Sequence, residues 1–224
     1  MTVPNNVQEI LELVAVDMRQ SADYSLLPKH RLSIYRAINS YDGQLADKFF
    51  SWLDFLTAQH LENIWNQEMA GDDFVPRILI IAKGLLQGTS TLEETKDERD
   101  LFYHAAGSLT YNEDVSSKAQ NIMLAAYNAL QTIYGITPFQ YADLEQIERG
   151  FSDEIVAGLS VADTAAYAVL AYAGFNVDYE YEADITESET EVEYTVFEPE
   201  KRLEFWEWWL FEAIPQAWEL TQTF

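Results

Sequence analysis

The 224-residue sequence contains no cysteine, which excludes disulfide cross-links and thiol chemistry and suits a reducing compartment. Two marks of a secreted or membrane protein are also missing. The N-terminal residues MTVPNNVQEI have neither the basic start nor the apolar run of a secretory signal. The longest stretch of small and apolar residues, around 164–174, is too short to cross a bilayer. We therefore expect a cytoplasmic protein that binds no membrane.

Basic residues are scarce and unevenly placed. Thirteen lysines and arginines stand against 38 aspartates and glutamates, giving a formal net charge of −25, and no basic residue lies between 151 and 200. Nucleic acid and anionic lipid repel such a molecule, whereas basic proteins and cations are attracted to it. A surface that is acidic only for solubility is the alternative. The uneven distribution of basic residues favours a basic protein as the partner, and we expect no binding to nucleic acid.

Motifs that carry chemistry are missing as well. The sequence has no glycine-rich phosphate loop, no Gly-x-Ser-x-Gly and no Glu-x-x-His pair for a di-iron centre. Of the three histidines, His60 lies on an apolar stripe, where we expect a core or boundary imidazole. Asp100 and His104 are one helical turn apart and could share a proton or a metal ion, but a single pair of such side chains is weak evidence for a site. We expect no catalytic residue, no metal site and no cofactor; an enzyme or metal protein is the least favoured alternative.

Apolar residues at helical spacing dominate the first two thirds of the chain. Capping residues, prolines and glycines mark where the helices begin and end. The pattern predicts an all-α fold, a bundle of about eight helices that forms one domain over 1–224. The expected helices start near Val7, at Pro28, after Gly43 (to about Glu68), at Pro76 (to Gly88), after the Thr91–Glu94 capping box (to about Leu109), at 115 (to 134), at Thr137–Pro138 (to Gly150), at Ser160–Asp163 (to Gly174) and at Glu200.

An acidic insertion at 176–199 interrupts the helical pattern. The stretch DYEYEADITESETEVEYTVFEPE, residues 178–200, holds ten carboxylates and no lysine, arginine or histidine. Its apolar residues alternate with acidic ones, as in a β-hairpin. Like charges that face each other across strands destabilise the pair, so an acidic loop is the alternative. In either form we expect the segment to be exposed to water, because burying unpaired carboxylates is very costly.

The C-terminal segment EKRLEFWEWWLFEAIPQAWEL is rich in aromatic residues. One predicted face carries Leu203, Trp206, Trp209, Leu210, Ala213 and Ala217, while Phe205, Trp208 and Phe211 project from other sides. Aromatic residues all round a helix indicate burial from several directions or an exposed anchor for a partner. Pro215 is expected to kink or end this helix.

Three segments together resemble a known family. They are LPKHRLSIYRAI, WLDFLTAQHLENIWNQEMAGDDFVPRILIIAKGLLQGTSTLEE and LEFWEWWLFEAIPQAW. They resemble the all-helical immunity proteins of bacterial polymorphic toxin systems, specifically the fifth numbered family of that collection. The resemblance implies a binding protein without enzymatic activity. Such a protein neutralises a cognate toxin by covering its active or substrate-binding surface.

The charge and the resemblance together give a predicted partner-binding site. Carboxylates of the acidic insertion would steer a basic toxin toward the protein, and tyrosines would supply packing contacts. A binding protein that mimics nucleic acid, or that sequesters some other factor, is the alternative. The predicted partner-binding residues are Asp178, Tyr179, Glu180, Tyr181, Glu182, Asp184, Glu187, Glu189, Glu191, Glu193, Tyr194 and Trp208.

Overall fold

The computed structural model describes residues 3–110, 114–136, 147–150, 152, 163–174 and 196–223. These residues form helices joined by short turns, and no strand occurs among them. The predicted all-α, multi-helix bundle is therefore confirmed. The helices are α1 (Asn5–Gln20), α2 (Pro28–Tyr41), α3 (Gly43–His60), α4 (Glu62–Glu68), α5 (Phe74–Leu86), α6 (Lys96–Thr110), α7 (Ser117–Ile133), α10 (Thr164–Ala173), α11 (Pro199–Trp208), the π-helical turn η1 (Trp209–Ala213) and α12 (Ile214–Thr223).

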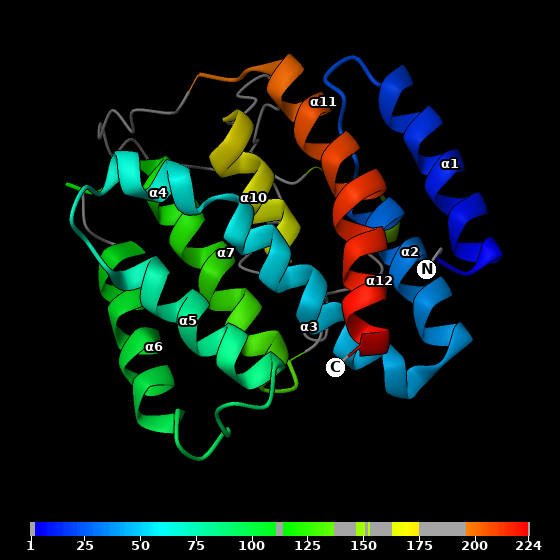
Figure 1. Cartoon of the computed structure of the whole chain (residues 1–224). Coiled ribbons are helices and arrows are strands. Elements are labelled where there is room, and N and C mark those ends of the chain that lie inside the picture. The colour runs from blue at the N-terminus through cyan, green and yellow to red at the C-terminus, as the bar shows by residue number, and fades with distance from the viewer. Residues whose placement is uncertain are drawn as a thin grey trace.

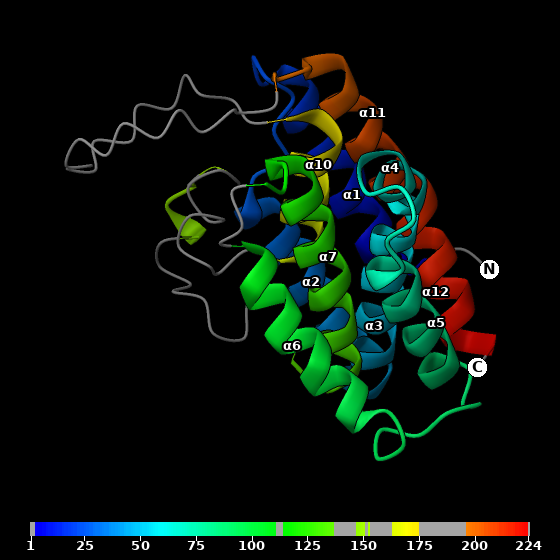
Figure 2. The ribbon, with the colours of Figure 1, turned by 90° about the vertical axis from the view of Figure 1, so that its left-hand side faces the viewer.

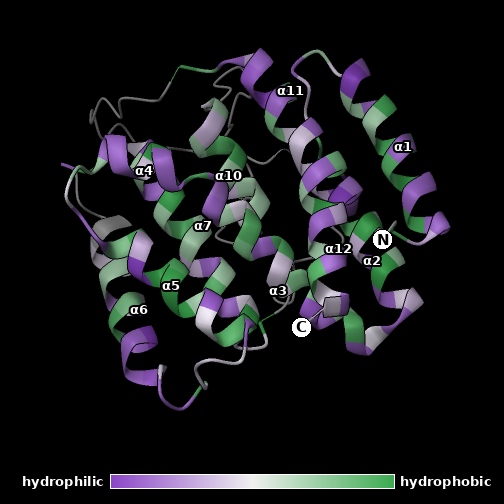
Figure 3. Cartoon of the chain, in the orientation of Figure 1, coloured by the Kyte–Doolittle hydropathy of each residue, from purple (hydrophilic) through white to green (hydrophobic). Residues whose placement is uncertain are grey.

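Helices α3 and α7 are central to the bundle. Helix α7 packs against α3, α5, α6 and α10, and α3 also packs against α2 and α12. In Figure 1, α4, α5 and α6 lie on one side of this pair, and α1, α2, α11 and α12 lie on the other. Figure 2 shows α3, α6, α7 and α12 running side by side in one general direction. Hydrophobic and hydrophilic residues alternate along α1 and α12, the pattern of helices with one buried face (Figure 3).

Side-chain caps begin several helices where the sequence predicts them. Asp42 accepts from the backbone N–H groups of α3, Ser116 from that of Ala119 at 3.1 Å, and Asp163 from that of Ala166 at 2.9 Å. Each cap satisfies a backbone donor that the first turn of a helix leaves free. The Thr91–Glu94 capping box is also present, with the Thr91 N–H donating to Glu94 at 2.8 Å. A turn separates this box from α6, which begins at Lys96.

The single helix predicted from Gly43 to about Glu68 is wrong, because α3 ends at His60 and α4 begins at Glu62. Leu61, which is fully buried, forms the turn, and its N–H binds the Ala58 carbonyl at 3.1 Å. The change of direction after this turn lets the Trp65 side chain enter the core, where its indole N–H donates to the Asp72 carbonyl at 3.2 Å. A buried leucine at the break and an unbroken apolar pattern conceal this boundary in the sequence.

A buried polar cluster joins α2, α3, α10 and η1. The Arg31 guanidinium donates to the Asp163 carboxylate at 2.8 Å, and both side chains are fully buried. The Tyr35 hydroxyl donates to the same carboxylate at 3.0 Å. The Trp209 indole donates to the Thr57 hydroxyl at 3.1 Å. Because these donors and acceptors are paired, the cluster fixes how the C-terminal segment lies on the bundle.

Two predicted features lie largely outside the described residues. The helix predicted from Thr137 to Gly150 is described only over 147–150. Of the acidic insertion at 176–199, the structure describes residues from Val196 onward. The choice between a hairpin and a loop therefore stays a prediction.

Candidate functional site

Most of the aromatic C-terminal segment belongs to the core. Trp206, Trp209, Leu210, Ala213 and Ala217 are buried, as the predicted face requires. Leu203 of the same face is half-buried. Phe205, which we expected to project elsewhere, is also fully buried, because it packs against Trp206 with ring centroids 4.9 Å apart. Trp208 is half-buried and Phe211 is 43% exposed, so these two rings are left to face outward.

The irregularity predicted at Pro215 is a π-helical turn just before it. The Ile214 N–H binds the carbonyl of Trp209, five residues earlier, rather than four as in an α-helix. Proline has no N–H and its ring clashes with the carbonyl four residues before it, so a wider turn at this point avoids that clash. The extra residue lets Trp206 and Trp209 stay buried before the turn, and Ala217 and Trp218 after it.

A surface groove of about 580 Å³ lies along α11 and η1. This volume falls within the range of ligand-binding sites in general. The groove also contains residues from the end of α1 and the end of α3. Its lining consists of Arg19, His60, Glu200, Leu203, Glu204, Glu207, Trp208, Phe211 and Glu212. Trp208, one of the predicted partner-binding residues, is therefore part of it.

Stacked aromatic rings form one part of the groove. The His60 imidazole lies on the Trp208 ring, with centroids 3.7 Å apart and planes 13° apart. His60 also stacks on Tyr172 of α10, at 5.5 Å and 24°. Burial lowers the pKa of His60, although the carboxylates of Glu204 and Glu212 oppose the effect. The imidazole is therefore neutral at pH 7, and the expected boundary histidine is an uncharged ring that supports Trp208.

Carboxylates surround these rings. Glu207 binds Arg19, whose Nε and Nη2 atoms lie 3.0 and 2.9 Å from one carboxylate oxygen. Glu204 accepts a hydrogen bond from the Tyr172 hydroxyl at 3.1 Å, and this bond adds to burial in raising the pKa of Tyr172. Glu200 and Glu212 are exposed and form no ion pair within the described part of the chain. The groove thus holds four carboxylates and a single arginine.

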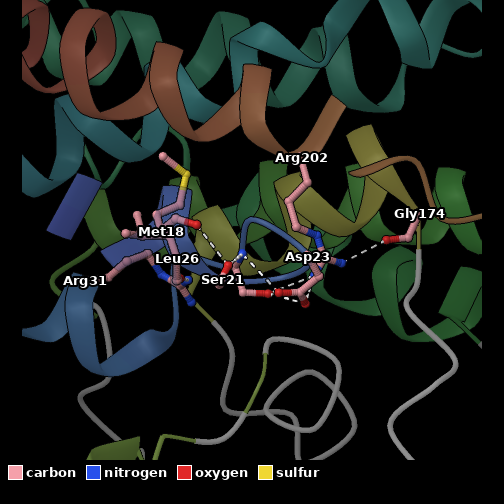
Figure 4. Close-up of polar contacts among 8 residues, drawn as sticks. Met18, Ser21, Asp23, Leu26, Arg31, Gly174 and Arg202 are labelled. Carbon is pink, nitrogen blue, oxygen red and sulfur yellow. Dashed lines mark hydrogen bonds and ion pairs between the residues drawn. The ribbon is translucent and has the colours of Figure 1, made fainter. Parts of the chain in front are cut away.

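The described residues on both sides of the acidic insertion meet at Arg202. The Arg202 side chain, which is 1% exposed, donates to the Gly174 carbonyl at 3.4 Å and to Asp23 at 3.3 Å (Figure 4). Its guanidinium carbon lies 4.4 Å from the centroid of the Phe197 ring. The Glu198 N–H binds the Ala173 carbonyl at 2.8 Å. The described residues on either side of 175–195 therefore lie close together.

The loop between α1 and α2 provides hydrogen-bond acceptors for the Arg202 side chain. The Ser21 hydroxyl donates to the Met18 carbonyl at 2.9 Å and accepts from the Ser25 N–H at 2.8 Å. The Ser25 hydroxyl donates to Asp23 at 2.6 Å and accepts from Arg202 at 3.1 Å. Figure 4 shows this chain of contacts running from α1 to Arg202 and Gly174. Because the loop is internally bonded, it offers Arg202 a fixed set of acceptors.

The other predicted site residues are not part of the described structure. They are Asp178, Tyr179, Glu180, Tyr181, Glu182, Asp184, Glu187, Glu189, Glu191, Glu193 and Tyr194, all outside the described residues. Asp100, weighed above as a partner of His104, instead binds the Arg99 guanidinium at 2.6 Å. Within the described ranges, no three histidine or acidic side chains are grouped as metal ligands.

Sequence reasoning missed most of the groove residues. Glu200, Glu204, Trp208 and Glu212 recur at every fourth position, and this spacing could have indicated one acidic face around a tryptophan. Nothing in the sequence indicates that Arg19 and His60 join them, because the bundle brings those residues together from two other helices.

The fold and groove define an acidic helical protein with a surface groove that contains one half-buried tryptophan. Among its described helices, none is long and apolar enough to span a membrane. Residues 14–216 match the family model described as immunity protein Imm5. The chain belongs to the Imm5 immunity protein family, which confirms the resemblance inferred from its sequence. No curated protein matches it.

Proposed function

We propose that the protein binds a cognate basic toxin in the cytoplasm and neutralises it by occluding the toxin's active or substrate-binding surface. The observation that carries the proposal is the family match over residues 14–216. In this role the protein acts by binding and performs no catalysis itself. Its partner is a protein rather than nucleic acid or a membrane.

The charge of the molecule supports a basic partner. A net charge of −25 attracts a cationic protein over long range, and complementary charge raises association rates and discriminates against wrong partners. Toxins that act on nucleic acid need basic surfaces to hold it, and an acidic inhibitor fits such a surface. The immunity protein would then compete with the toxin's substrate for the same basic residues.

The groove and the ends of the acidic insertion both lie at the start of α11. Glu200 of the groove is the second residue of this helix, and Phe197 and Glu198, at the end of the insertion, come directly before the helix. In the proposed complex the predicted carboxylates between Asp178 and Glu193 meet the toxin together with the groove. Trp208 supplies the packing contact that tryptophan commonly provides at the centre of an interface.

The test is to express the chain with the toxin encoded beside its gene and to purify either one. We expect a stoichiometric complex in which the toxin's activity is lost, and protection of cells that produce both proteins. Matched tests use an unrelated basic toxin, which should neither bind nor be inhibited. If the chain does not bind the toxin encoded beside its gene but competes with DNA or RNA for another cellular protein, the proposal is wrong. The protein would then act as a nucleic-acid mimic.

A further inference from the structure

The groove along α11 and η1 already holds one guanidinium group. Arg19 is bound through Nε and Nη2 to Glu207, and its guanidinium carbon lies 5.6 Å from the centroid of the Phe211 ring. A carboxylate and an aromatic ring are the two groups that recognise arginine best, one through charge-assisted hydrogen bonds and one through cation–π attraction. One end of the groove is thus occupied by an arginine of the chain itself.

The rest of the groove has the same kinds of group without a cation. Trp208 is supported by His60; Glu204 and Glu200 lie one and two turns before it along α11, and Glu212 lies about one turn after it. Since burial lowers the pKa of His60, that ring supplies no positive charge at pH 7. Among the described residues, neither Glu200 nor Glu212 has an ion-pair partner, and Glu204 is bound only by the neutral Tyr172 hydroxyl.

This arrangement is unfavourable for the isolated helix. Glu200 and Glu204 are four residues apart on α11, so they lie on one face, and like charges at this spacing destabilise a helix. Glu204 and Glu207 are three apart, which adds a second unfavourable pair that Arg19 relieves at only one member. A further cation placed between Glu200, Glu204 and Trp208 would remove the repulsion and gain a ring contact.

We propose that this groove receives an arginine side chain of the toxin, which stacks on Trp208 and donates to Glu204 and Glu200. The inference rests on the proposed function and names the chemistry by which the partner is recognised. Arginine fits better than lysine because its planar guanidinium stacks on a ring and carries several donors in a fixed fork. A metal ion fits less well, since the described carboxylates are not grouped as metal ligands.

The first experiment uses a small probe and needs no toxin. N-acetyl-arginine amide is titrated into the full-length protein while the indole N–H signals are followed by NMR, with the Trp208 signal assigned from a Trp208→Phe variant. The arginine amide should shift the Trp208 signal, and N-acetyl-citrulline amide, which has the same shape without charge, should not. Equal shifts with both compounds overturn the inference.

The second experiment measures binding of the neighbouring toxin to a groove variant, Glu200→Gln/Glu204→Gln. The matched control, Glu93→Gln/Asp97→Asn, removes the same charge from exposed residues near the start of α6, on the other side of the bundle. We expect the groove variant to weaken binding at least about tenfold more than the control, as loss of a specific charge pair does. Circular dichroism should be alike for both variants, since all four residues are exposed, and the groove variant should unfold at a temperature no lower than the control because it loses the Glu200–Glu204 repulsion.

The outcomes separate the two proposals. If wild-type protein binds the toxin and both variants bind equally well, the toxin does not use the groove for an arginine, and the proposed function stands. If wild-type protein fails to bind the toxin, the proposed function falls and the inference about its partner falls with it. A tenfold difference between variants, lost when one toxin arginine is changed to alanine, assigns that arginine to the groove.

Discussion

Asp54, on the buried side of α3, is an acid held in an environment that disfavours its charge. Its side chain is 2% exposed and accepts a hydrogen bond from the Thr132 hydroxyl at 2.6 Å. Burial raises the pKa of Asp54 to about 7, and the negative charge of Asp163 adds to the effect, while the Thr132 bond opposes it. The buried arginine nearby, Arg31, is already paired with Asp163.

This raised pKa makes stability depend on pH in a definite direction. An aspartate with a folded-state pKa above its ordinary value of 3.8 binds more protons folded than unfolded between pH 4 and 7. Its contribution to stability is therefore fully present below about pH 4 and is lost as the pH rises to about 7. The difference of about three pKa units corresponds to at most about 4 kcal/mol, at about 1.4 kcal/mol per unit.

We expect Asp54→Asn to raise the free energy of unfolding at pH 8 by up to that amount and to change it little at pH 4. The asparagine oxygen can still accept from Thr132, and the group no longer loses a proton. Urea unfolding at several pH values measures the effect. As a control, Asp54→Ala should destabilise at pH 4, because it leaves the Thr132 hydroxyl without this acceptor and creates a cavity, and it should be less stable than Asp54→Asn at every pH. Parallel pH curves for wild type and Asp54→Asn would contradict the prediction.

At the residue scale, the local role of a side chain could be predicted from the sequence better than its long-range contacts. Asp163 as a helix cap and His60 as a boundary imidazole could be predicted, since both follow from local spacing. That Asp163 also binds Arg31, 132 positions away, could not, because long-range pairing depends on how the helices pack. The same limit applies to the stacking of His60 on Trp208.

The π-helical turn η1 is the element that sets the groove. It adds one residue between α11 and α12, and Phe211 within it is exposed at the groove. Helices on both sides of the turn are packed: Trp206 before it lies in the core, and Trp218 after it packs on Phe49 at 6.2 Å between ring centroids. A regular α-helix through this segment could not keep both faces buried.

Removing that extra residue should be tolerated where removing another is not. We expect deletion of Phe211 in a Pro215→Ala background to keep the fold, because it converts the π-turn to an α-turn without rotating α11 against α12. The matched deletion of Glu204 lies in the regular turns of α11 and rotates one packed face by about 100°, so it should abolish cooperative unfolding. Circular dichroism and thermal melts distinguish the two. Similar losses in both variants would show that η1 is not a removable insertion.

At the element scale, helix ends with strong capping residues could be predicted and helix irregularities could not. Pro28, Asp163 and Gly174 mark their boundaries in the sequence, and the structure places helix ends there. The break at Leu61 and the π-turn have no such signal, since both serve the burial of large side chains. Pro215 indicated a helix irregularity in this segment. That the irregularity is a π-helical turn depends on the packing of the helix faces before and after it.

For the whole molecule, charge is the property with the longest reach. The net charge of −25 acts over a distance set by the ionic strength, about 10 Å at 0.1 M salt. The charge follows directly from composition, so its sign and its bias toward the C-terminal half could be predicted. The single domain over 1–224 and the partner-binding role of the carboxylates between 178 and 193 stay predictions.

Toxin association should therefore slow steeply as salt increases. Between low and high salt we expect the association rate constant to fall by roughly 10- to 1000-fold, while the dissociation rate constant changes less. Stopped-flow mixing with the toxin measures both. A variant with Glu187, Glu189, Glu191 and Glu193 changed to glutamine should associate more slowly at low salt and show a weaker salt dependence. If the association rate constant of the wild-type protein does not depend on ionic strength, the acidic insertion does not steer the toxin.

The contacts around Arg202 affect how the sequence of the acidic insertion can vary between related proteins. Ala173 and Glu198 are joined by a 2.8 Å hydrogen bond, and Arg202 contacts both the Gly174 carbonyl and Phe197. The entropy cost of joining two fixed points by a chain segment grows only slowly with the length of the segment, so these two points accept segments of different length at little cost in stability. In the proposed complex, partner specificity can therefore change through the sequence of 175–195 while the helices on either side stay the same.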